Sequence, residues 1–461
     1  MSATESLSED PVLAMPPPLA RRMGLFRFMR TVRDSSIATY PLESYQLEFA
    51  DRSFLWARAY IVNAPAGVKH VLLDNAANYI KTRVSRRLLE PGLGHGLLTS
   101  EGDVWRGHRR VMAPSFDPRS VAGYAPIMTR IAAETLARWD VLPNGSPIDV
   151  MEAMMETTLH IIGETMFSAE SGDIVDVVAR GVERYQLEVR PTLFDLLPLP
   201  DWIPSRRSFT HPERIFSEFD AKIDRMLAER TRTGAAERPD LLGRLIAARD
   251  EETGGGMSPS EVRDQIITIF MAGHETTSLA LTWTWYLLSQ HPEAEAKLHS
   301  ELASVLDGRA PDYPDVAKLR YARIVIDEAM RLYPPAHTLS RQAVAEDEVM
   351  GHAIEPGSSV YIVPWLLHRN RKLWENPDKF DPERFSPERA AARDRYAYIP
   401  FGAGPRICIG AAFAITEAVL LLATIAQRYR LRLKPGHPVE PQGLITLRPR
   451  HGMAMILERR L

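Results

Sequence analysis

The sequence has a single cysteine, little net charge and no internal repeats, and these absences exclude several classes of protein. One cysteine in 461 residues rules out a disulfide-stabilised scaffold. The 56 Lys and Arg residues nearly balance the 59 Asp and Glu residues, and a net charge of −3 gives no reason to expect nucleic-acid binding. Because 45% of the residues are hydrophobic, we expect a large, soluble, globular protein rather than a disordered chain.

The amino terminus also lacks targeting features. Residues 1–28 contain neither a basic start followed by an apolar run nor an 18-residue apolar stretch, so we expect no signal peptide, no transmembrane anchor and a cytoplasmic location. Pro16, Pro17 and Pro18 predict an extended arm over residues 1–30; recognition by a proline-binding module is the less favoured alternative. No linker divides the rest, so residues 31–461 are expected to form one catalytic domain.

Hydrophobic periodicity indicates a mainly α fold with a small β portion. A strand over 54–62 and a helix over 65–73 are expected first, followed by mostly helical segments from 102 to about 246. The Pro-rich segment 191–212 is predicted to be a loop packed on the core, with a mobile lid or a membrane-touching patch as alternatives. Further strands are expected at 340–344, 360–363, 444–447 and 453–457.

The strongest helix signal begins at Ser258, where Ser258 and Glu261 can form a capping box, and ends at His291-Pro292. About 32 residues give a rod of roughly 48 Å, long enough to cross a domain. Its ionisable residues indicate a buried central helix rather than a membrane span; they are Arg263, Asp264, His274 and Glu275. Another helix is expected over 314–333, ended by a Pro-Pro pair.

The single cysteine, Cys408, lies in the glycine-rich segment 401–410, directly before an apolar helical run over 411–426. Backbone N–H groups of such a loop and the positive end of the following helix both favour a thiolate. A lone cysteine is usually an inert buried residue, but a thiolate in this setting is suited to be the axial ligand of a haem iron. Arg406 could pair with a haem propionate or be solvated.

The middle of the long helix carries small residues and a possible proton relay. Ala272, Gly273 and Thr276 are spaced to share one face, where a flat ligand could approach the backbone. Thr276 can either hydrogen-bond back to the Ala272 carbonyl or, with Glu275, carry protons to a bound ligand. Because an unpaired glutamate in a core is costly, the relay is the favoured interpretation.

The residues Phe401, Gly404, Arg406, Cys408 and Gly410 match the haem-binding signature of the cytochrome P450 family, and the sequence resembles that family over nearly its whole length. The resemblance implies the cytochrome P450 fold, with a long central helix over haem b and Cys408 as the iron ligand. It implies that Glu275 and Thr276 protonate iron-bound oxygen. The other residues expected to contact haem are Phe401, Gly402, Arg406, Gly410, Ala272 and Gly273.

Further motifs in this resemblance concern haem anchoring. Trp105 and Arg109, four residues apart on a predicted helix, match a Trp-x-x-x-Arg pattern that implies propionate contacts, and Arg341 is a weaker candidate for the second propionate. By themselves, Glu328 and Arg331 would suit a solvated helix pair. The resemblance instead places Glu328, Arg331 and Arg384 in a buried structural triad that supports the cysteine loop.

The resemblance leaves no room for a flavin or nicotinamide domain, because its signatures extend almost to residue 461. Electrons from NAD(P)H are therefore expected to arrive through a ferredoxin or flavodoxin with its reductase, and the chain is expected to be monomeric. One hypothesis is a basic docking surface near Cys408; solvated side chains are the alternative. Its residues are Arg106, Arg110, Arg371 and Lys372.

The predicted function is hydroxylation of an apolar small molecule, such as a fatty acid, terpenoid or steroid, with O2. A buried Arg83 or Arg190 could bind a substrate carboxylate, although a surface position is favoured. A peroxide-dependent or rearranging enzyme, or a non-catalytic haem sensor or electron carrier, remains as an alternative. By resemblance the pocket walls are residues 82–99, 181–216, 270–277, 336–339 and 444–446.

Overall fold

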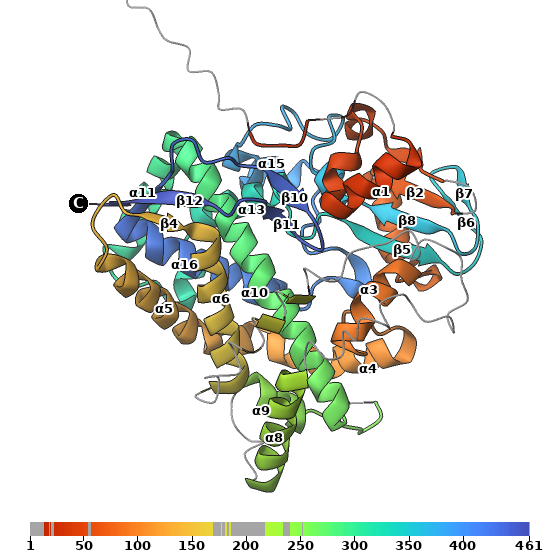
Figure 1. Cartoon of the computed structure of the whole chain (residues 1–461), viewed down its shortest axis with the longest axis horizontal. Coiled ribbons are helices and arrows are strands. Elements are labelled where there is room, and N and C mark those ends of the chain that lie inside the picture. The colour runs from red at the N-terminus through yellow and green to blue at the C-terminus, as the bar shows by residue number, and fades with distance from the viewer. Residues whose placement is uncertain are drawn as a thin grey trace, which may run out of the picture.

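A computed structural model of the chain describes residues 13–17, 19, 23–53, 57–168, 177, 180–181, 184–185, 217–233, 240–250 and 252–460. Helices occupy most of the view in Figure 1, and a small sheet lies at one side, on the right of the picture. The predicted loop over 191–212 lies outside the described residues, as does Arg190. The helical character and the short strands agree with the sequence-based expectation.

The central helix α10 (Pro259–Gln290) has the limits that the sequence predicts. The Ser258 hydroxyl accepts a hydrogen bond from the Glu261 backbone N–H, and the Glu261 carboxylate accepts one from the Ser258 N–H at 2.8 Å. These two bonds satisfy N–H groups that a helix start leaves without partners. The helix crosses the molecule diagonally in Figure 1 and is buried over most of its length.

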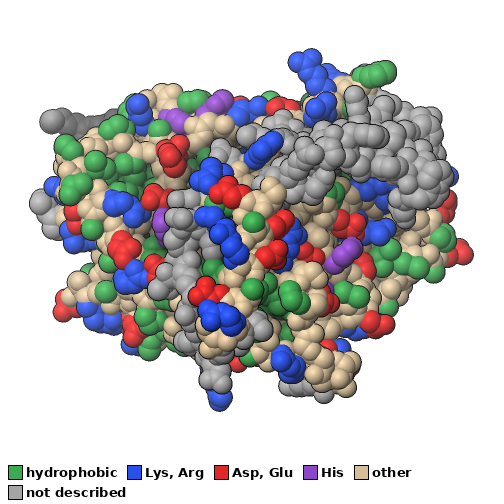
Figure 2. Space-filling view, turned by 60° about the horizontal axis from the view of Figure 1, so that its bottom comes forward, with side chains coloured by type: hydrophobic (Ala, Val, Ile, Leu, Met, Phe, Trp, Pro, Cys, Tyr) green, Lys and Arg blue, Asp and Glu red, His purple; other side chains and the backbone are tan. Residues whose placement is uncertain are grey.

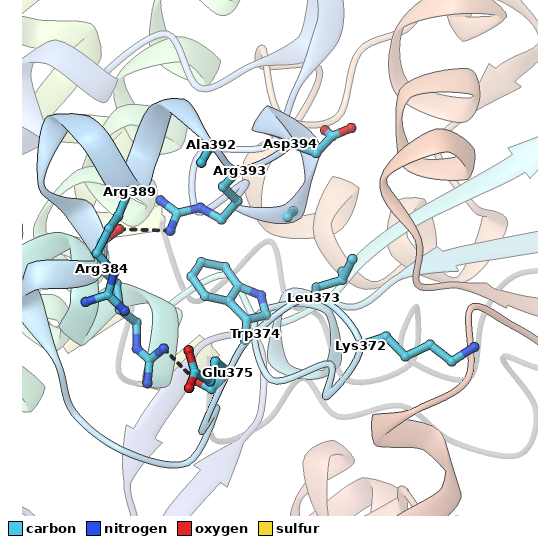
Figure 3. A pocket seen from close by; sticks show the side chains of 10 residues that line it. Lys372, Leu373, Trp374, Glu375, Arg384, Arg389, Ala392, Arg393 and Asp394 are labelled. Carbon is cyan, nitrogen blue, oxygen red and sulfur yellow. Dashed lines mark hydrogen bonds between the residues drawn. The ribbon is translucent and has the colours of Figure 1, made fainter.

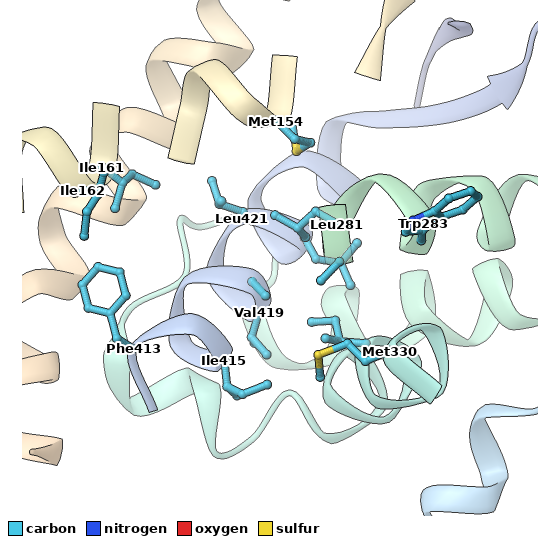
Figure 4. Packing of buried hydrophobic residues seen from close by; sticks show 14 of the residues in the cluster. Met154, Ile161, Ile162, Leu281, Trp283, Met330, Phe413, Ile415, Val419 and Leu421 are labelled. Carbon is cyan, nitrogen blue, oxygen red and sulfur yellow. The ribbon is translucent and has the colours of Figure 1, made fainter. Parts of the chain in front are cut away.

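Helices α5 (Pro118–Asp140), α6 (Val150–Phe167), α13 (Arg320–Leu332) and α16 (Ala411–Arg428) form the main core with α10. Apolar side chains from four of these helices converge in Figure 4. They include Met154, Ile161 and Ile162 of α6, Leu281 and Trp283 of α10, Met330 of α13, and Phe413, Ile415, Val419 and Leu421 of α16. Trp283 also stacks on Tyr333, with ring centroids 4.1 Å apart.

The largest sheet has five strands in the order β1-β2-β8-β5-β3. Its members are β1 (Phe49–Asp51), β2 (Ala59–Val62), β3 (Tyr79–Ile80), β5 (Leu339–Ala343) and β8 (Ser359–Ile362). Strand β2 pairs in parallel with β8, and the other neighbours are antiparallel. Three of the predicted strands therefore lie side by side in one sheet.

Smaller sheets are formed by β4 (Pro147–Asp149), β12 (Ala454–Arg459) and β9 (Tyr429–Leu433), by β6 (Asp347–Val349) and β7 (His352–Ile354), and by β10 (Pro441–Gly443) and β11 (Leu447–Pro449). The strand predicted over 444–447 is wrong for its first three residues. Residues 444–446 form the turn between β10 and β11, where Leu444 N donates to the Thr446 carbonyl at 3.0 Å. The turn exposes Ile445 and turns Thr446 inward.

The remaining helices are α1 (Leu25–Asp34), α2 (Pro65–Lys69), α3 (Arg83–Leu93), α4 (Gly102–Met112), α8 (Ser217–Thr233), α9 (Leu241–Ala247), α11 (Pro292–Leu306), α12 (Tyr313–Val316), α14 (Pro364–Leu367) and α15 (Pro387–Ala391). Two boundaries differ from the expectations. The helix predicted over 314–333 is divided into α12 and α13, with Leu319 buried between them. Helix α1 begins inside the segment 1–30 that was expected to be extended, and its Met29 and Val32 are half-buried.

Among the described residues, α16 is the one helix long and apolar enough to cross a membrane, and 72% of it is buried inside the protein. Basic and acidic side chains are mixed over the face shown in Figure 2, in agreement with the near-zero net charge.

Candidate active site

The segment 401–410 forms a tight loop that presents Cys408 directly before α16. The Cys408 N–H donates to the Phe401 carbonyl at 2.9 Å, which closes the loop across seven residues. Gly404 has a φ of +69°, and a Cβ atom there would fall 1.7 Å from the carbonyl oxygen of Leu72. A side chain at position 404 is therefore excluded both by the backbone conformation and by the neighbouring chain.

The Cys408 side chain is accessible, although protein surrounds much of it. Burial raises the pKa of the Cys408 thiol, while a hydrogen bond from the Gly410 backbone N–H and the positive charge of Arg109 act in the opposite direction. The predicted contribution of the loop backbone is therefore present, and burial is the larger influence on the pKa of the thiol. Metal coordination would have to supply the remaining driving force for deprotonation.

The small residues of α10, which were predicted to share one face, lie in different environments. Ala272 is exposed in the middle of a helix whose neighbouring residues are mostly buried, and Thr276, one turn later, is half-buried. The Thr276 hydroxyl donates to the Ala272 carbonyl at 2.7 Å, the local bond that the alternative interpretation required. A Cβ atom added at Gly273 would instead lie 3.4 Å from Cδ1 of Ile162, so this position faces α6.

The expectation that Glu275 lacks a partner is wrong. Its side chain is buried, and it accepts a hydrogen bond from the Thr446 hydroxyl at 2.6 Å and forms an ion pair with Arg448. Both partners belong to the β10–β11 region, about 170 residues further along the chain. The carboxylate is thus held as a paired charge next to the Thr276 position.

The predicted propionate residues gather around Trp105 of α4. The Arg406 guanidinium lies over the Trp105 ring at 4.3 Å, and Arg109 lies 6.0 Å from the same ring. Arg109 Nη1 donates to the Ile407 carbonyl at 2.8 Å, next to Cys408. Arg406 forms an ion pair with Glu101, which directly precedes α4. The structure therefore joins α4 to the cysteine loop.

Lys81 is a member of this cluster that the sequence did not reveal. It follows β3, and burial together with the charges of Arg406 and Arg341 lowers the pKa of Lys81 to about 7. Burial and Arg406 likewise lower the pKa of Arg341 to about 10. No sequence motif surrounds Lys81. The pairing of β3 with β5, the strand that carries Arg341, brings Lys81 to this cluster.

These side chains fit the haem that the sequence resemblance implies. Lys81, Arg341 and Arg406 share one neighbouring carboxylate, Glu101, and their lowered pKa values arise because their charges repel and are partly removed from water. An anionic group bound there would relieve this repulsion. The two propionates of haem b supply that charge at one edge of a flat ring, and Cys408 supplies a sulfur ligand.

The structure brings Glu328, Arg331 and Arg384 together in the interior. Arg331 donates to both oxygens of Glu328, at 2.6 and 2.8 Å, and Arg384 Nε lies 3.3 Å from Glu328 Oε1. Arg331 also donates to three backbone carbonyls, those of His368, Pro377 and Lys379, at 2.8 to 2.9 Å. The pair therefore fixes the segment 368–384 from within.

A cavity of about 290 Å³ adjoins this network (Figure 3). Trp374 lies on its wall with Arg384 and Arg393, and the Arg393 guanidinium stacks on Trp374 at 4.5 Å. None of its lining residues belongs to the expected substrate walls. It is a separate hollow beside the structural triad.

Several of the expected walls lie next to each other. The Ser85 and Ser340 hydroxyls are 2.8 Å apart, which links α3 to β5. His337 Nε2 lies 2.9 Å from the Leu444 carbonyl oxygen, linking the walls 336–339 and 444–446. Leu97 N donates to Gln265 of α10 at 2.8 Å. Most of the wall 181–216 lies outside the described residues.

Each of the four residues of the predicted basic docking surface has an acidic neighbour, and the docking role stays a prediction. Arg106 pairs with Asp103, Arg110 with Asp250 at 2.8 Å and Glu252 at 3.2 Å, Arg371 with Asp378 at 3.9 Å, and Lys372 with Glu48 at 3.1 Å. These pairings reduce the net positive charge of the surface.

Glu417 of α16 is a second residue that sequence reasoning missed. Its side chain is 1% exposed, and burial raises the pKa of its carboxyl to about 8, partly offset by a hydrogen bond with Thr277 of α10. The signal was present, because Glu417 is the one charged residue in the otherwise apolar run 411–426. The carboxyl is therefore protonated at neutral pH.

Comparison with known proteins adds independent information. The family model described as "Cytochrome P450" matches residues 53–453. The chain is 39% identical to a cyclooctatin synthase of Streptomyces melanosporofaciens over 84% of each chain. It is 33% identical to a pentalenene oxygenase of Streptomyces avermitilis over 77% of this chain and 78% of the relative.

Among solved structures, the chain is similar to the crystal structure of the cytochrome P450DA heme domain. The TM-score is 0.82 at 25% sequence identity, and the match covers 98% of this chain and 99% of that one. The part of this chain that the structure describes therefore shares the fold of that heme domain.

Proposed function

The chain belongs to the cytochrome P450 family and is a monooxygenase of that family, and we propose that it hydroxylates an apolar terpenoid. Related chains named for cyclooctatin and pentalenene support a terpenoid over a fatty acid or a steroid. The proposed reaction is R–H + O2 + two electrons + two protons → R–OH + H2O, in which a C–H bond is converted to C–OH.

The observation that carries the proposal is the joining of the Cys408 loop to a cationic cluster through α4. We assign Cys408 as the haem iron ligand and Lys81, Trp105, Arg341 and Arg406 as propionate contacts. Haem b, when bound, supplies the iron centre at which O2 is activated. Arg109 contributes by holding the Ile407 carbonyl and by placing a positive charge near the sulfur.

We assign proton handling to Thr276 and Glu275. Thr276 holds a hydroxyl proton at the exposed centre of α10, and its present bond to the Ala272 carbonyl must break when the hydroxyl turns toward a bound ligand. Glu275 holds a negative charge one residue away, stabilised by Arg448 and Thr446. An acid beside an alcohol can pass protons inward while the surrounding apolar side chains exclude bulk water.

Electrons are proposed to come from NAD(P)H through a ferredoxin or flavodoxin and its reductase, with the enzyme working as a monomer in the cytoplasm. The paired charges around Arg106, Arg110, Arg371 and Lys372 argue against strong attraction by this patch alone. A moderate salt dependence of the first reduction step would agree with that.

The first test is the absorption spectrum of the dithionite-reduced protein with carbon monoxide, compared with Cys408→His. A strongly red-shifted Soret band in the wild type but not in the variant is expected for thiolate ligation. Terpene hydrocarbons and alcohols are then screened by haem spin-state shift, and turnover with ¹⁸O2 should place one labelled atom in the product. Label arriving only from added peroxide would favour the peroxide-dependent alternative, and an absence of any spin shift would favour a sensor.

A further inference from the structure

The loop that joins α3 to α4 is held against the first half of α10 by hydrogen bonds from its backbone to side chains of that helix. Leu97 N donates to Gln265 Oε1 at 2.8 Å, and His95 N donates to Asp264 Oδ2 at 2.7 Å. A Cβ atom added at Gly94 would overlap the Asp264 carboxylate, so the lack of a side chain there allows this close approach.

The other end of the same loop contacts the cysteine loop. Arg406 Nη1 donates to the Ser100 carbonyl at 3.1 Å, and Arg406 also pairs with Glu101. On α10, Gln265 precedes the exposed Ala272 by about two turns. The loop therefore spans the space between α10 and the cationic cluster assigned to the haem propionates, which places it at the edge of the proposed pocket.

Gln265 extends this contact to α4. Its side chain is fully buried, and its Nε2 lies 3.1 Å from Nδ1 of His108, which is also buried. The other ring nitrogen of His108, Nε2, lies 3.3 Å from Oε1 of Glu261, the residue that completes the capping box of α10. A chain of hydrogen bonds therefore runs from the start of α10 through α4 to the backbone of the loop at Leu97.

The donor and the acceptor of each bond in this chain can be assigned. The Leu97 N–H can only donate, so Gln265 accepts through Oε1 and donates through Nε2. His108 Nδ1 is then an acceptor, and the ring proton lies on Nε2, where it is donated to the Glu261 carboxylate. Every polar group of the chain is satisfied while His108 is neutral.

Protonation of His108 would break this pattern. The cation carries an N–H at Nδ1, which would face the donating Nε2 of Gln265. Turning the Gln265 amide over would place Nε2 against the Leu97 N–H, so one bond is lost in either arrangement. Asp250, from the segment after α9, pairs with Arg110 of α4 at 2.8 Å rather than with this ring.

We propose that Gln265 and His108 are positioning residues of the pocket, which hold the loop at Leu97 as a closed wall and thereby set how fast an apolar ligand enters and leaves. The bond to Gln265 reaches the backbone, so it fixes the path of the chain, while the Leu97 side chain packs on the main core. Loss of the bond frees the loop from the helix or leaves a buried amide without a partner. This inference rests on the proposed function only for the identity of the ligand.

The first test is amide hydrogen exchange of the haem-loaded full chain, followed by mass spectrometry of the peptide that covers this loop. Gln265→Leu removes the acceptor for Leu97 N, and His108→Phe removes the acceptor for Gln265 Nε2. Both should raise the exchange rate of the peptide about tenfold, because each breaks one buried hydrogen bond. Gln290→Leu on α10 and His160→Phe on α6 are the matched controls, because both residues lie outside this chain of hydrogen bonds.

Gln265→Glu separates a hydrogen-bonding role from a general loss of packing. The introduced carboxylate can still accept from Leu97 N, but it can pair with His108 Nδ1 only when the two groups share a proton. In the wild type, loop protection corrected for the intrinsic pH dependence of exchange should fall between about pH 8 and about pH 5, where histidines gain a proton. In Gln265→Glu it should rise over the same interval.

Ligand kinetics supply the second readout. An apolar imidazole such as phenylimidazole binds haem iron and shifts the Soret band, so its dissociation can be followed without a known substrate. It should dissociate about tenfold faster from Gln265→Leu and His108→Phe, with the carbon monoxide spectrum of the wild type retained. Unchanged loop exchange, an unchanged dissociation rate, or the same pH dependence in the wild type and Gln265→Glu would overturn the proposal. If the expected results are obtained but no terpenoid shifts the spin state, the proposed substrate is wrong and the positioning role stands.

Discussion

The buried carboxyl of Glu417 predicts a pH-dependent contribution to stability that a single substitution should remove. In the folded protein burial raises its pKa to about 8, compared with an ordinary value of 4.5. Between these values the folded chain binds more protons at this position than the unfolded chain. The contribution is therefore complete below about pH 4.5 and is lost as the pH rises toward 8.

The magnitude follows from the size of the pKa difference. Each pH unit within the interval should lower the free energy of unfolding by at most about 1.4 kcal/mol, and the whole interval by on the order of 5 kcal/mol. Because Glu417 is only 1% exposed, solvent screening reduces this little. Glu417→Gln keeps a neutral group of similar shape beside Thr277, and it should remove the dependence.

Urea unfolding of the haem-loaded protein, followed by circular dichroism between about pH 5 and pH 8, measures this effect. The wild-type stability minus that of Glu417→Gln should fall steadily as the pH rises. Glu388→Gln is the control, because Glu388 is exposed on α15 and should leave the slope unchanged. If the difference in the free energy of unfolding between the wild type and Glu417→Gln does not change over this pH range, Glu417 is not a protonated, buried carboxyl.

Three further predictions concern other charged residues, Glu328, Arg448 and Lys81. Glu328→Ala should leave Arg331 as an unpaired buried charge, cost about 3 to 5 kcal/mol and yield little haem-loaded protein, so a normal ratio of Soret to protein absorbance would contradict the triad assignment. Arg448→Ala should destabilise the protein by about 3 kcal/mol by leaving Glu275 without its cation, whereas Arg448→Lys should keep most of the urea midpoint. Lys81→Gln should speed haem loss to a scavenging protein about tenfold by removing one charge-assisted contact, and an unchanged rate would exclude Lys81 from the propionate site.

Local chemistry in the sequence was enough to place the major elements. The limits of α10 follow from a capping box at Ser258 and a proline after His291, and both act within a few residues. The cysteine loop was similarly readable, because Gly404 and Cys408 lie in one short segment with a distinctive spacing. The turn at 444–446 was misread as strand because its apolar residues are also those of a short strand.

The partners of buried charges could not be read in the same way. Glu275 meets Arg448 across about 170 residues, and Glu417 meets Thr277 across the interface of α16 and α10. Lys81 joins Arg341 and Arg406 only because β3 pairs with β5 and the cysteine loop lies against α4. Periodicity and spacing indicate the local structure around a residue. They do not indicate which residue from a distant segment will contact it in the folded protein.

The sequence by itself thus determined the fold class, the family resemblance and the identity of the cysteine ligand candidate, because caps, turns and ligand loops are local. Only the tertiary structure decided how each buried charge is compensated, which acid remains protonated, and which residue of α10 holds the loop at Leu97. Burial and electrostatic pairing are properties of the packed interior, and they arise when elements far apart in the chain come into contact.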